Sequence, residues 1–215
     1  MMIIDHNHPK YISKWKYSGV NKYNGAFYYS KEIVKNIIPN IVTKRAWITV
    51  NIEGIGCDHA IVFVHNNLHP EHYDWLAKYD DLILVCGIPE TVEKVQHLGK
   101  AIYLPLSIDV KTVISYWKLK SKNAAFVGRP AKRKGINFPA NVDIIEGLPR
   151  EKLLQRMAEY KDIYAVGRTA IEAKALGCNI IPYDPRFPDP SIWNVLDNKE
   201  AAQILQKQLN RIDKY

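Results

Sequence analysis

The feature that most constrains the fold is the way apolar residues are distributed along the chain. Aliphatic and β-branched residues come in short continuous runs rather than in strict alternation with polar ones. Continuous runs of this kind predict strands that are buried on both faces, as in a parallel sheet covered by helices. The runs are Trp47–Ile52, Ala60–Val64, Asp81–Cys86, Ala101–Leu104, Asn123–Val127, Val142–Ile145, Ile163–Val166 and Asn179–Pro182.

The segments between these runs have the spacing of amphipathic helices. Pro89 and Pro149 open two of them, and proline is favoured in the first turn of a helix. Alternation of strands and helices predicts an α/β fold with doubly wound parallel sheets. The expected helices are Phe27–Ile38, Pro89–Leu98, Pro149–Tyr160, Thr169–Leu176 and Lys199–Ile212.

The pattern breaks between Leu106 and Lys122, where a basic run, Lys118–Lys122, precedes a new strand. We interpret that run as solvated and the break as a domain boundary. The expected organisation is an N-terminal domain over residues 1–106, a second domain over 107–198 and a C-terminal helix over 199–215. Each domain is then small but within the usual size range.

Charge and cysteine content narrow the function classes. The chain has 215 residues, with 30 Lys and Arg against 22 Asp and Glu, a formal net charge of +8. This excess favours an anionic partner, which could be nucleic acid, an anionic membrane surface or a phosphate-bearing small molecule. Cys57, Cys86 and Cys178 suit neither a disulfide framework nor a zinc site. Without a signal-like or membrane-spanning run, we expect a cytoplasmic protein.

A first candidate site follows the strand that ends near Val127. Gly128 and Arg129 come next, and Lys134 follows five residues after the arginine. Ligands of open α/β sheets bind at the edge where strands end. Arginine offers a fork of N–H donors and lysine a compact positive charge, and the two together suit a diphosphate. The alternative is an ordinary basic surface loop.

A second candidate site joins a strand end to a helix start. Gly167, Arg168 and Thr169 stand at this junction, where unpaired backbone N–H groups can hold an anion. Glu172 lies early in the helix, and its carboxylate could accept hydrogen bonds from two neighbouring hydroxyls, as a ribose offers. The alternative is an ordinary helix start with an acidic residue that the helix dipole favours.

Two weaker signals lie nearer the N-terminus. Gly25 stands in a loop where backbone could closely approach a phosphate or sugar, although the preceding Asn24 also makes a plain turn. His65 follows a buried strand and could contact a ligand. His65, His69 and His72 also raise a metal site, but Pro70 makes a single helical ligand face improbable, so we expect no metal.

Taken in order, these segments resemble the GT-B glycosyltransferases, in particular the retaining glycosyltransferase family 4, also called glycosyl transferases group 1. The similarity covers most of the chain and is most specific in two motifs. These are the Gly-Arg…Lys-Gly segment at Gly128–Gly135 and the Glu-Ala-x-Ala-x-Gly segment at Glu172–Gly177. Asn24–Ala26, His65 and Leu104–Asp109 match more weakly.

The resemblance implies two reduced Rossmann-like domains and a metal-independent hexosyl transfer from a nucleotide-diphosphate sugar, with UDP-sugar expected as the donor. Arg129 and Lys134 would hold the diphosphate and stabilise the leaving nucleotide. Glu172 would bind the ribose hydroxyls, and His65 would face the transferred sugar. The remaining donor-binding positions would be Gly25, Gly128, Gly167, Arg168 and Thr169.

Two positions depart from the family pattern. Tyr164 stands eight residues before Glu172, where the family usually has a glutamate that contacts the donor sugar, and Ser107 replaces a usual glycine. The first departure motivates an alternative, a catalytically silent nucleotide-binding relative. A DNA-binding or DNA-modifying protein is a further alternative, motivated by the +8 charge and the many tyrosines and tryptophans. The acceptor stays open between a lipid carrier, a polysaccharide, a protein and a modified base.

Overall fold

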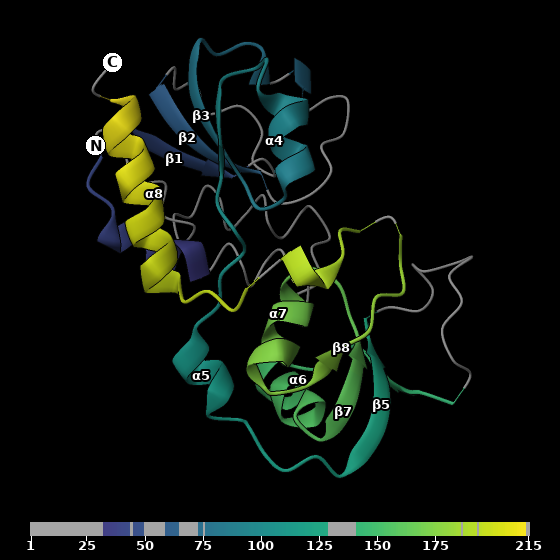
Figure 1. The fold of residues 1–215 in the computed structure, drawn as a ribbon. Helices are drawn as coiled ribbons and strands as arrows, with labels where there is room; N and C mark the ends of the chain where they lie inside the picture. Colours follow the sequence, from purple (N-terminus) through teal and green to yellow (C-terminus); the bar gives the residue numbers. More distant parts are fainter. Residues whose placement is uncertain are drawn as a thin grey trace. The chain divides into compact units, whose positions relative to one another are not determined.

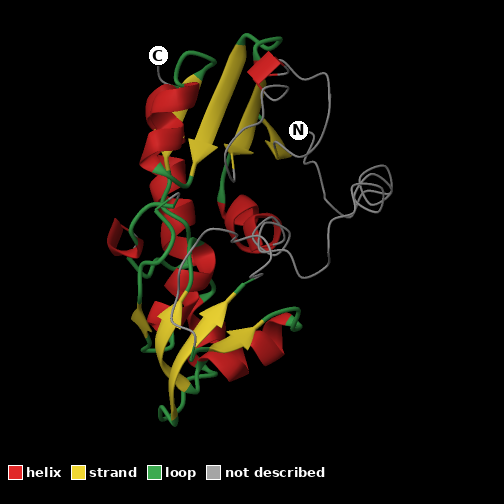
Figure 2. Ribbon diagram, turned by 90° about the vertical axis from the view of Figure 1, so that its right-hand side faces the viewer, coloured by secondary structure: helices red, strands yellow, loops and turns green. Residues whose placement is uncertain are grey.

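The computed structural model describes residues 32–43, 45–49, 59–64, 73–74, 76–128, 141–185, 187–192 and 194–213. The chain divides into two compact units. Unit 1 comprises residues 1–105 and 199–215, and unit 2 comprises residues 106–198. Each unit contains one parallel sheet (Figures 1 and 2).

Unit 1 has a four-stranded sheet whose strands lie in chain order. The strands are β1 (Ala46–Thr49), β2 (His59–Val64), β3 (Asp81–Cys86) and β4 (Lys100–Tyr103), and every pair is parallel. After their first residues, β2 and β3 are buried throughout, which explains their continuous apolar sequences. The helix α4 (Pro89–Val95) links β3 to β4 and begins with a proline at its first position.

The last helix of the chain, α8 (Asn198–Ile212), completes unit 1 and lies beside its sheet in Figure 1. Arg45, which is buried, connects the helix end to the sheet. Its guanidinium forms ion pairs of 3.0 Å with both Asp81, the first residue of β3, and Asp213. Two short helical segments, η1 (Ile33–Ile37) and η2 (Ile38–Asn40), precede β1.

Unit 2 has a second four-stranded parallel sheet, with strand order β6-β5-β7-β8. The strands are β5 (Lys122–Val127), β6 (Asp143–Ile145), β7 (Tyr160–Tyr164) and β8 (Asn179–Ile180). The helices α6 (Arg150–Met157) and α7 (Arg168–Ala175) connect β6 to β7 and β7 to β8. A 3-10 turn, η4 (Pro190–Ile192), follows β8.

The chain enters and leaves unit 2 through two segments that are hydrogen-bonded to each other. Ile108 pairs with Asp197 in an isolated parallel bridge. Ser107 is completely buried, and its hydroxyl donates to Asn198 Oδ1 at 2.8 Å. Ser107, which stands where the glycosyltransferase pattern has a glycine, therefore helps to join the first and last segments of unit 2.

The expectation of an α/β fold with parallel sheets is confirmed, and the architecture is consistent with a Rossmann-like fold. Several predicted elements differ from the structure: the strand expected at 179–182 is only Asn179–Ile180, and the described end of the helix expected at 27–38 is a π-helix followed by a 3-10 helix. The strand expected at Ile163–Val166 begins earlier, at Tyr160, because its residues pair with β5 over Lys122–Phe126. The break between Leu106 and Lys122 contains a short helix, α5 (Val110–Ile114), which Asp109 caps through its side chain. Among the described residues, no helix is long and apolar enough to cross a membrane.

Candidate functional site at the carboxyl edge of the unit 2 sheet

The strand order of unit 2 marks one place on the sheet as the expected ligand position. From β5 the chain goes to β6 on one side and then crosses to β7 on the other. In open parallel sheets, ligands bind outside the carboxyl ends of the strands where the order reverses in this way. Here that point lies between the ends of β5 and β7. Among the described strands of unit 1, which follow chain order, no such reversal occurs.

Two of the predicted donor-binding glycines stand at this switch point. Gly128 follows β5 directly, has φ +148°, and its N–H donates to the Ile145 carbonyl at 3.1 Å. Gly167 follows β7 after two residues and precedes α7, with φ +59° and ψ −138°. Side chains other than hydrogen strain such backbone conformations, so both turns favour glycine. The structure therefore brings these two predicted segments to one edge of one sheet.

A cluster of three charged side chains, of which Glu172 and Arg168 are buried and Arg150 is partly exposed, lies at the same edge. Glu172 is only 1% exposed. Its Oε1 forms an ion pair of 3.1 Å with Nε of Arg168, one helical turn earlier, and a second ion pair with Nη2 of Arg150. Arg150 is the first residue of α6, and Arg168 is the first residue of α7. The cluster thus connects the first turns of two neighbouring helices.

The charge balance of this cluster leaves an excess of positive charge. Two guanidinium groups share one carboxylate, so the three side chains carry a net charge of +1. The N-terminal ends of helices are themselves positive, which disfavours an arginine there unless an acid or another anion accompanies it. Glu172 provides that acid from within the protein. Both carboxylate oxygens are buried and neither has a hydrogen-bond partner among the described residues, and both ion pairs are made by Oε1.

Beside this edge, the residues after β8 form an aromatic and acidic hollow of about 350 Å³. The Tyr183 ring lies edge-on to Phe126 at 5.3 Å and to Tyr164 at 6.4 Å between centroids. Asp184, 5% exposed, is one of the two acids that line the hollow. Tyr164 therefore packs into an aromatic cluster. The hollow is lined by Val166, Pro182, Tyr183, Asp184, Pro185, Phe187, Pro188, Asp189 and Pro190.

The other predicted site residues have a mixed outcome. Thr169 is half-buried in the first turn of α7, as expected for a residue beside a helix start. Gly25, His65, Arg129 and Lys134 lie outside the described residues. The roles predicted for these four residues stay predictions.

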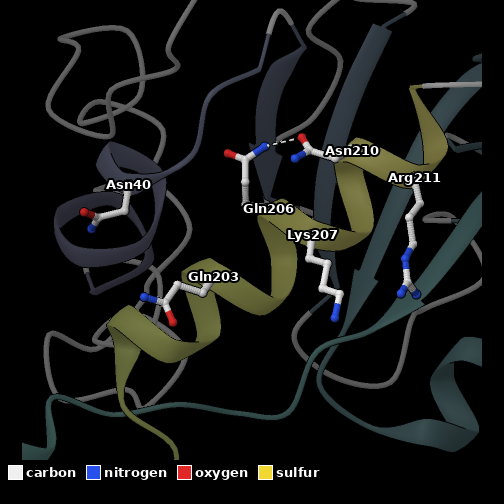
Figure 3. Close-up of a pocket in the computed structure, with 6 residues that line it drawn as sticks. All are labelled: Asn40, Gln203, Gln206, Lys207, Asn210 and Arg211. Atoms are coloured by element: carbon white, nitrogen blue, oxygen red, sulfur yellow. Dashed lines mark hydrogen bonds between the residues drawn. The ribbon is translucent and has the colours of Figure 1, made fainter.

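A larger hollow, of about 510 Å³, lies along α8 in unit 1 (Figure 3). Much of its polar lining is already hydrogen-bonded within the protein. The Gln206 side chain accepts from the Val42 N–H at 2.6 Å and donates to Asn210 Oδ1 at 2.8 Å. Lys207 and Arg211 extend together from the helix (Figure 3). We interpret the bonded amides as structural, because they hold residue 42 against the helix.

Sequence reasoning missed Arg150. The segment was expected to be a helix, but its first arginine was given no role. A signal was present, because two successive helices of unit 2 both begin with arginine, where the helix dipole favours acids. Two such positions at helix starts on one edge of the sheet indicate a shared anionic group, and Glu172 supplies it.

Among the described residues, no three histidine, cysteine, aspartate or glutamate side chains gather as a metal site requires. The site is therefore defined by its glycines, its two arginines and Glu172. Comparisons with protein-family models, with curated proteins and with solved structures found no match to this chain.

Proposed function

We propose that the protein is a glycosyltransferase of the GT-B type, which moves a sugar from a nucleotide-diphosphate donor to an acceptor. The observation that carries the proposal is the position of Gly128, Gly167 and Glu172 at the switch point of a parallel sheet. A diphosphate needs fixed cations and backbone N–H groups, and this edge has two helix starts and the ion-paired guanidinium groups of Arg150 and Arg168. The two compact units would be the two Rossmann-like lobes of that fold.

In this proposal each residue type has a defined task. Arg129 and Lys134 follow Gly128 in the sequence and would contact the diphosphate, where they would stabilise the negative charge that develops on the leaving nucleotide. The start of α7, at Arg168 and Thr169, would add backbone N–H groups. His65 would face the transferred sugar, and Gly25 would allow close approach of backbone to the donor.

Glu172 would receive the ribose hydroxyls through Oε2. This oxygen is suited to the task because Oε1 is already paired with two arginines, which hold the carboxylate in position. The carboxylate is enclosed in the structure, so ribose binding requires the side chains around it to move. A buried acceptor without a hydrogen bond is costly, and a hydroxyl donor would remove that cost.

The test is nucleotide binding by the full chain, monitored by thermal unfolding. The ligands are UDP, GDP, ADP and CDP and the corresponding nucleotide sugars. A ligand that binds only the folded state raises the unfolding temperature. Lys134→Ala should weaken binding by roughly tenfold or more, as expected when a charge-assisted contact is lost. Lys132→Ala is the matched control in the same segment and should bind as the unmodified chain does. Absence of binding by every nucleotide would contradict the proposal.

A second candidate function is a nucleotide-binding protein that does not transfer sugar. It is favoured by Tyr164, whose ring packs on Tyr183 at the position where a sugar-contacting glutamate was expected from the resemblance. Donor hydrolysis separates the two functions. Nucleotide binding together with release of free sugar supports the transferase, whereas binding without any turnover of the nucleotide sugars supports the silent relative.

A further inference from the structure

The opposite edge of the unit 2 sheet carries exposed apolar side chains that the proposed function does not use. Ile114, Trp117 and Leu119 are 48%, 56% and 82% exposed. They come from one stretch, which leaves α5 and leads to the start of β5 along the lower side of Figure 1. We call this segment, residues 114–122, the amino-edge segment.

The ammonium groups of Lys118 and Lys120 bond to neighbouring groups of unit 2, whereas the apolar residues of the amino-edge segment are exposed to solvent. Lys118 Nζ contacts Glu159 at 3.2 Å. Lys120 Nζ donates to the carbonyls of Ala158 and Leu176 at 3.0 and 2.6 Å, at the C-terminal ends of α6 and α7. Leu119 lies between these two anchored lysines. This is the reverse of the arrangement expected for a surface in water, where apolar groups turn inward.

Trp117 is held in place in a similar way. An added side-chain carbon on Gly177 would lie 3.2 Å from the indole Nε1, so the ring edge rests against this glycine. More than half of the residue stays exposed. The indole is thus presented at the surface in one position rather than folded into the core.

The charge around this apolar surface is positive. Lys118, Lys122 and Arg156 all contact the Glu159 carboxylate, at 3.2, 3.0 and 2.8 Å. Three cations and one acid carry a net charge of +2, and Asp143, which accepts from the hydroxyl of the Tyr160 ring under Lys122 and Arg156, lowers it to +1. Lys111, which is also exposed, adds another positive charge on α5.

From this arrangement we propose that the amino-edge segment binds the surface of an anionic lipid bilayer. Tryptophan and aliphatic side chains partition into the interfacial region, and lysines near them are attracted by anionic headgroups. Single-stranded nucleic acid is less well matched, because Ile114 and Leu119 offer no ring on which a base could stack. The carboxyl edge, at the other end of the same strands, would then face away from the lipid.

The direct test is co-sedimentation of the full chain with vesicles. Vesicles of phosphatidylcholine with about 30% phosphatidylserine should bind the protein at low salt, and pure phosphatidylcholine should bind it weakly. Raising the salt to about 0.5 M should reduce binding to the anionic vesicles. Equal binding to both lipids, or no binding to the anionic ones, would overturn the proposal.

Two variants distinguish binding through the amino-edge segment from nonspecific adsorption to vesicles. The double variant Ile114→Ser, Leu119→Ser should lose roughly tenfold or more of its vesicle affinity, because these side chains would no longer enter the bilayer. Val42→Ser is the matched control, since Val42 is 87% exposed but belongs to unit 1. A control that loses as much affinity as the double variant would overturn the proposal. The proposal would also be overturned if the protein bound a single-stranded oligonucleotide but no vesicles, and if that binding depended on Leu119.

Discussion

The two edges of the unit 2 sheet carry similar sets of charges in different surroundings. At the carboxyl edge, Glu172 is shared by Arg150 and Arg168 and its side chain is 1% exposed. At the amino edge, Glu159 is shared by three cations, and its side chain is 22% exposed. Each cluster has one acid and an excess of positive charge.

The difference in burial gives the clusters different physical roles. Glu172 and Arg168 are buried, with side chains 1% and 9% exposed, so water cannot take the place of a lost partner and the remaining charge is left uncompensated in the interior. An exposed cluster is solvated when a partner is lost, and its ion pairs contribute little to the free energy of unfolding. The carboxyl edge should therefore be sensitive to single substitutions and the amino edge tolerant of them.

The largest effect is expected from Glu172→Gln. The substitution preserves shape but removes the negative charge that Arg168 and Arg150 share, and the free energy of unfolding should fall by about 3–5 kcal/mol. Urea denaturation measures the change, and Glu159→Gln is the matched control at the other edge. Similar, small changes in both variants would contradict the comparison and show that the carboxyl-edge cluster is effectively solvated.

A smaller effect is expected at the end of α7, which reaches the amino edge. Gly177 has φ +74°, and the helix closes there with N–H groups of Gly177 and Cys178 bonded to the carbonyls of Lys174 and Ala173. Gly177→Ala should lower the free energy of unfolding by about 1–2 kcal/mol from backbone strain. The contact with Trp117 should add to this loss.

A double-mutant cycle separates the two contributions to the Gly177→Ala effect. In a Trp117→Ala background, only the backbone contribution should remain, so the measured loss should be smaller. Gly167→Ala is a comparison at the carboxyl edge, where an added side-chain carbon has no atom within 4 Å and only the backbone contributes. An identical loss with and without Trp117 would show that the indole yields without cost.

Features of the fold that depend on local sequence could be predicted. The continuous runs in β2, β3 and β5 were correctly assigned to a buried parallel sheet, because burial on both faces leaves a simple local signal. Gly128 and Gly167 could be placed at strand ends because each directly follows an apolar run. The bounds of β7 were displaced, because its pairing with β5 is set by residues far away in the chain.

Pairings between distant residues were not predictable. The ion pair of Arg150 with Glu172 joins two helices, and although an arginine at each helix start indicates a nearby anionic group, it does not specify which residue supplies that group. The basic run Lys118–Lys122 was interpreted as solvated, yet Lys118 and Lys120 bond to groups on the rest of unit 2. Composition alone cannot distinguish a lysine in water from one that caps two helices, because the distinction depends on tertiary packing.

Tyr160 offers a prediction at high pH. It begins β7 at the amino edge, is 1% exposed, and its hydroxyl donates to Asp143 Oδ2 at 2.6 Å. Burial, together with this hydrogen bond to Asp143, raises the pKa of Tyr160 from 10 to about 12. Stability from the neutral phenol is therefore complete below pH 10 and is lost as the pH rises toward 12.

The comparison of the unmodified chain with Tyr160→Phe isolates this phenol from the other tyrosines. Tyr160→Phe should cost about 1 kcal/mol near neutral pH, when its hydrogen bond is lost. The difference in unfolding free energy should shrink between pH 10 and 12, as measured by urea denaturation. A difference that stays constant across this range would contradict the assigned cause.

The smallest change in the free energy of unfolding is expected from substitution of Glu159 at the amino edge. Hydrogen bonds from Lys122 and Lys118 hold the pKa of Glu159 below its ordinary value. A lowered pKa in the folded state means that the stabilisation is complete above pH 4.5 and is lost as the pH falls through the folded-state pKa. Because the cluster is solvated, Glu159→Gln should cost only about 0.2–1 kcal/mol at pH 7, and less as the solution is acidified.

The same variant acts in opposite directions on stability and on the proposed lipid contact. Removal of the acid leaves Lys118, Lys122 and Arg156 without their shared carboxylate, so affinity for anionic vesicles should increase while affinity for neutral vesicles stays the same. Urea denaturation and vesicle co-sedimentation of one protein preparation measure both effects. A large loss of stability at pH 7 would mean that Glu159 resembles Glu172, and the two edges would then not differ in the way their exposure indicates.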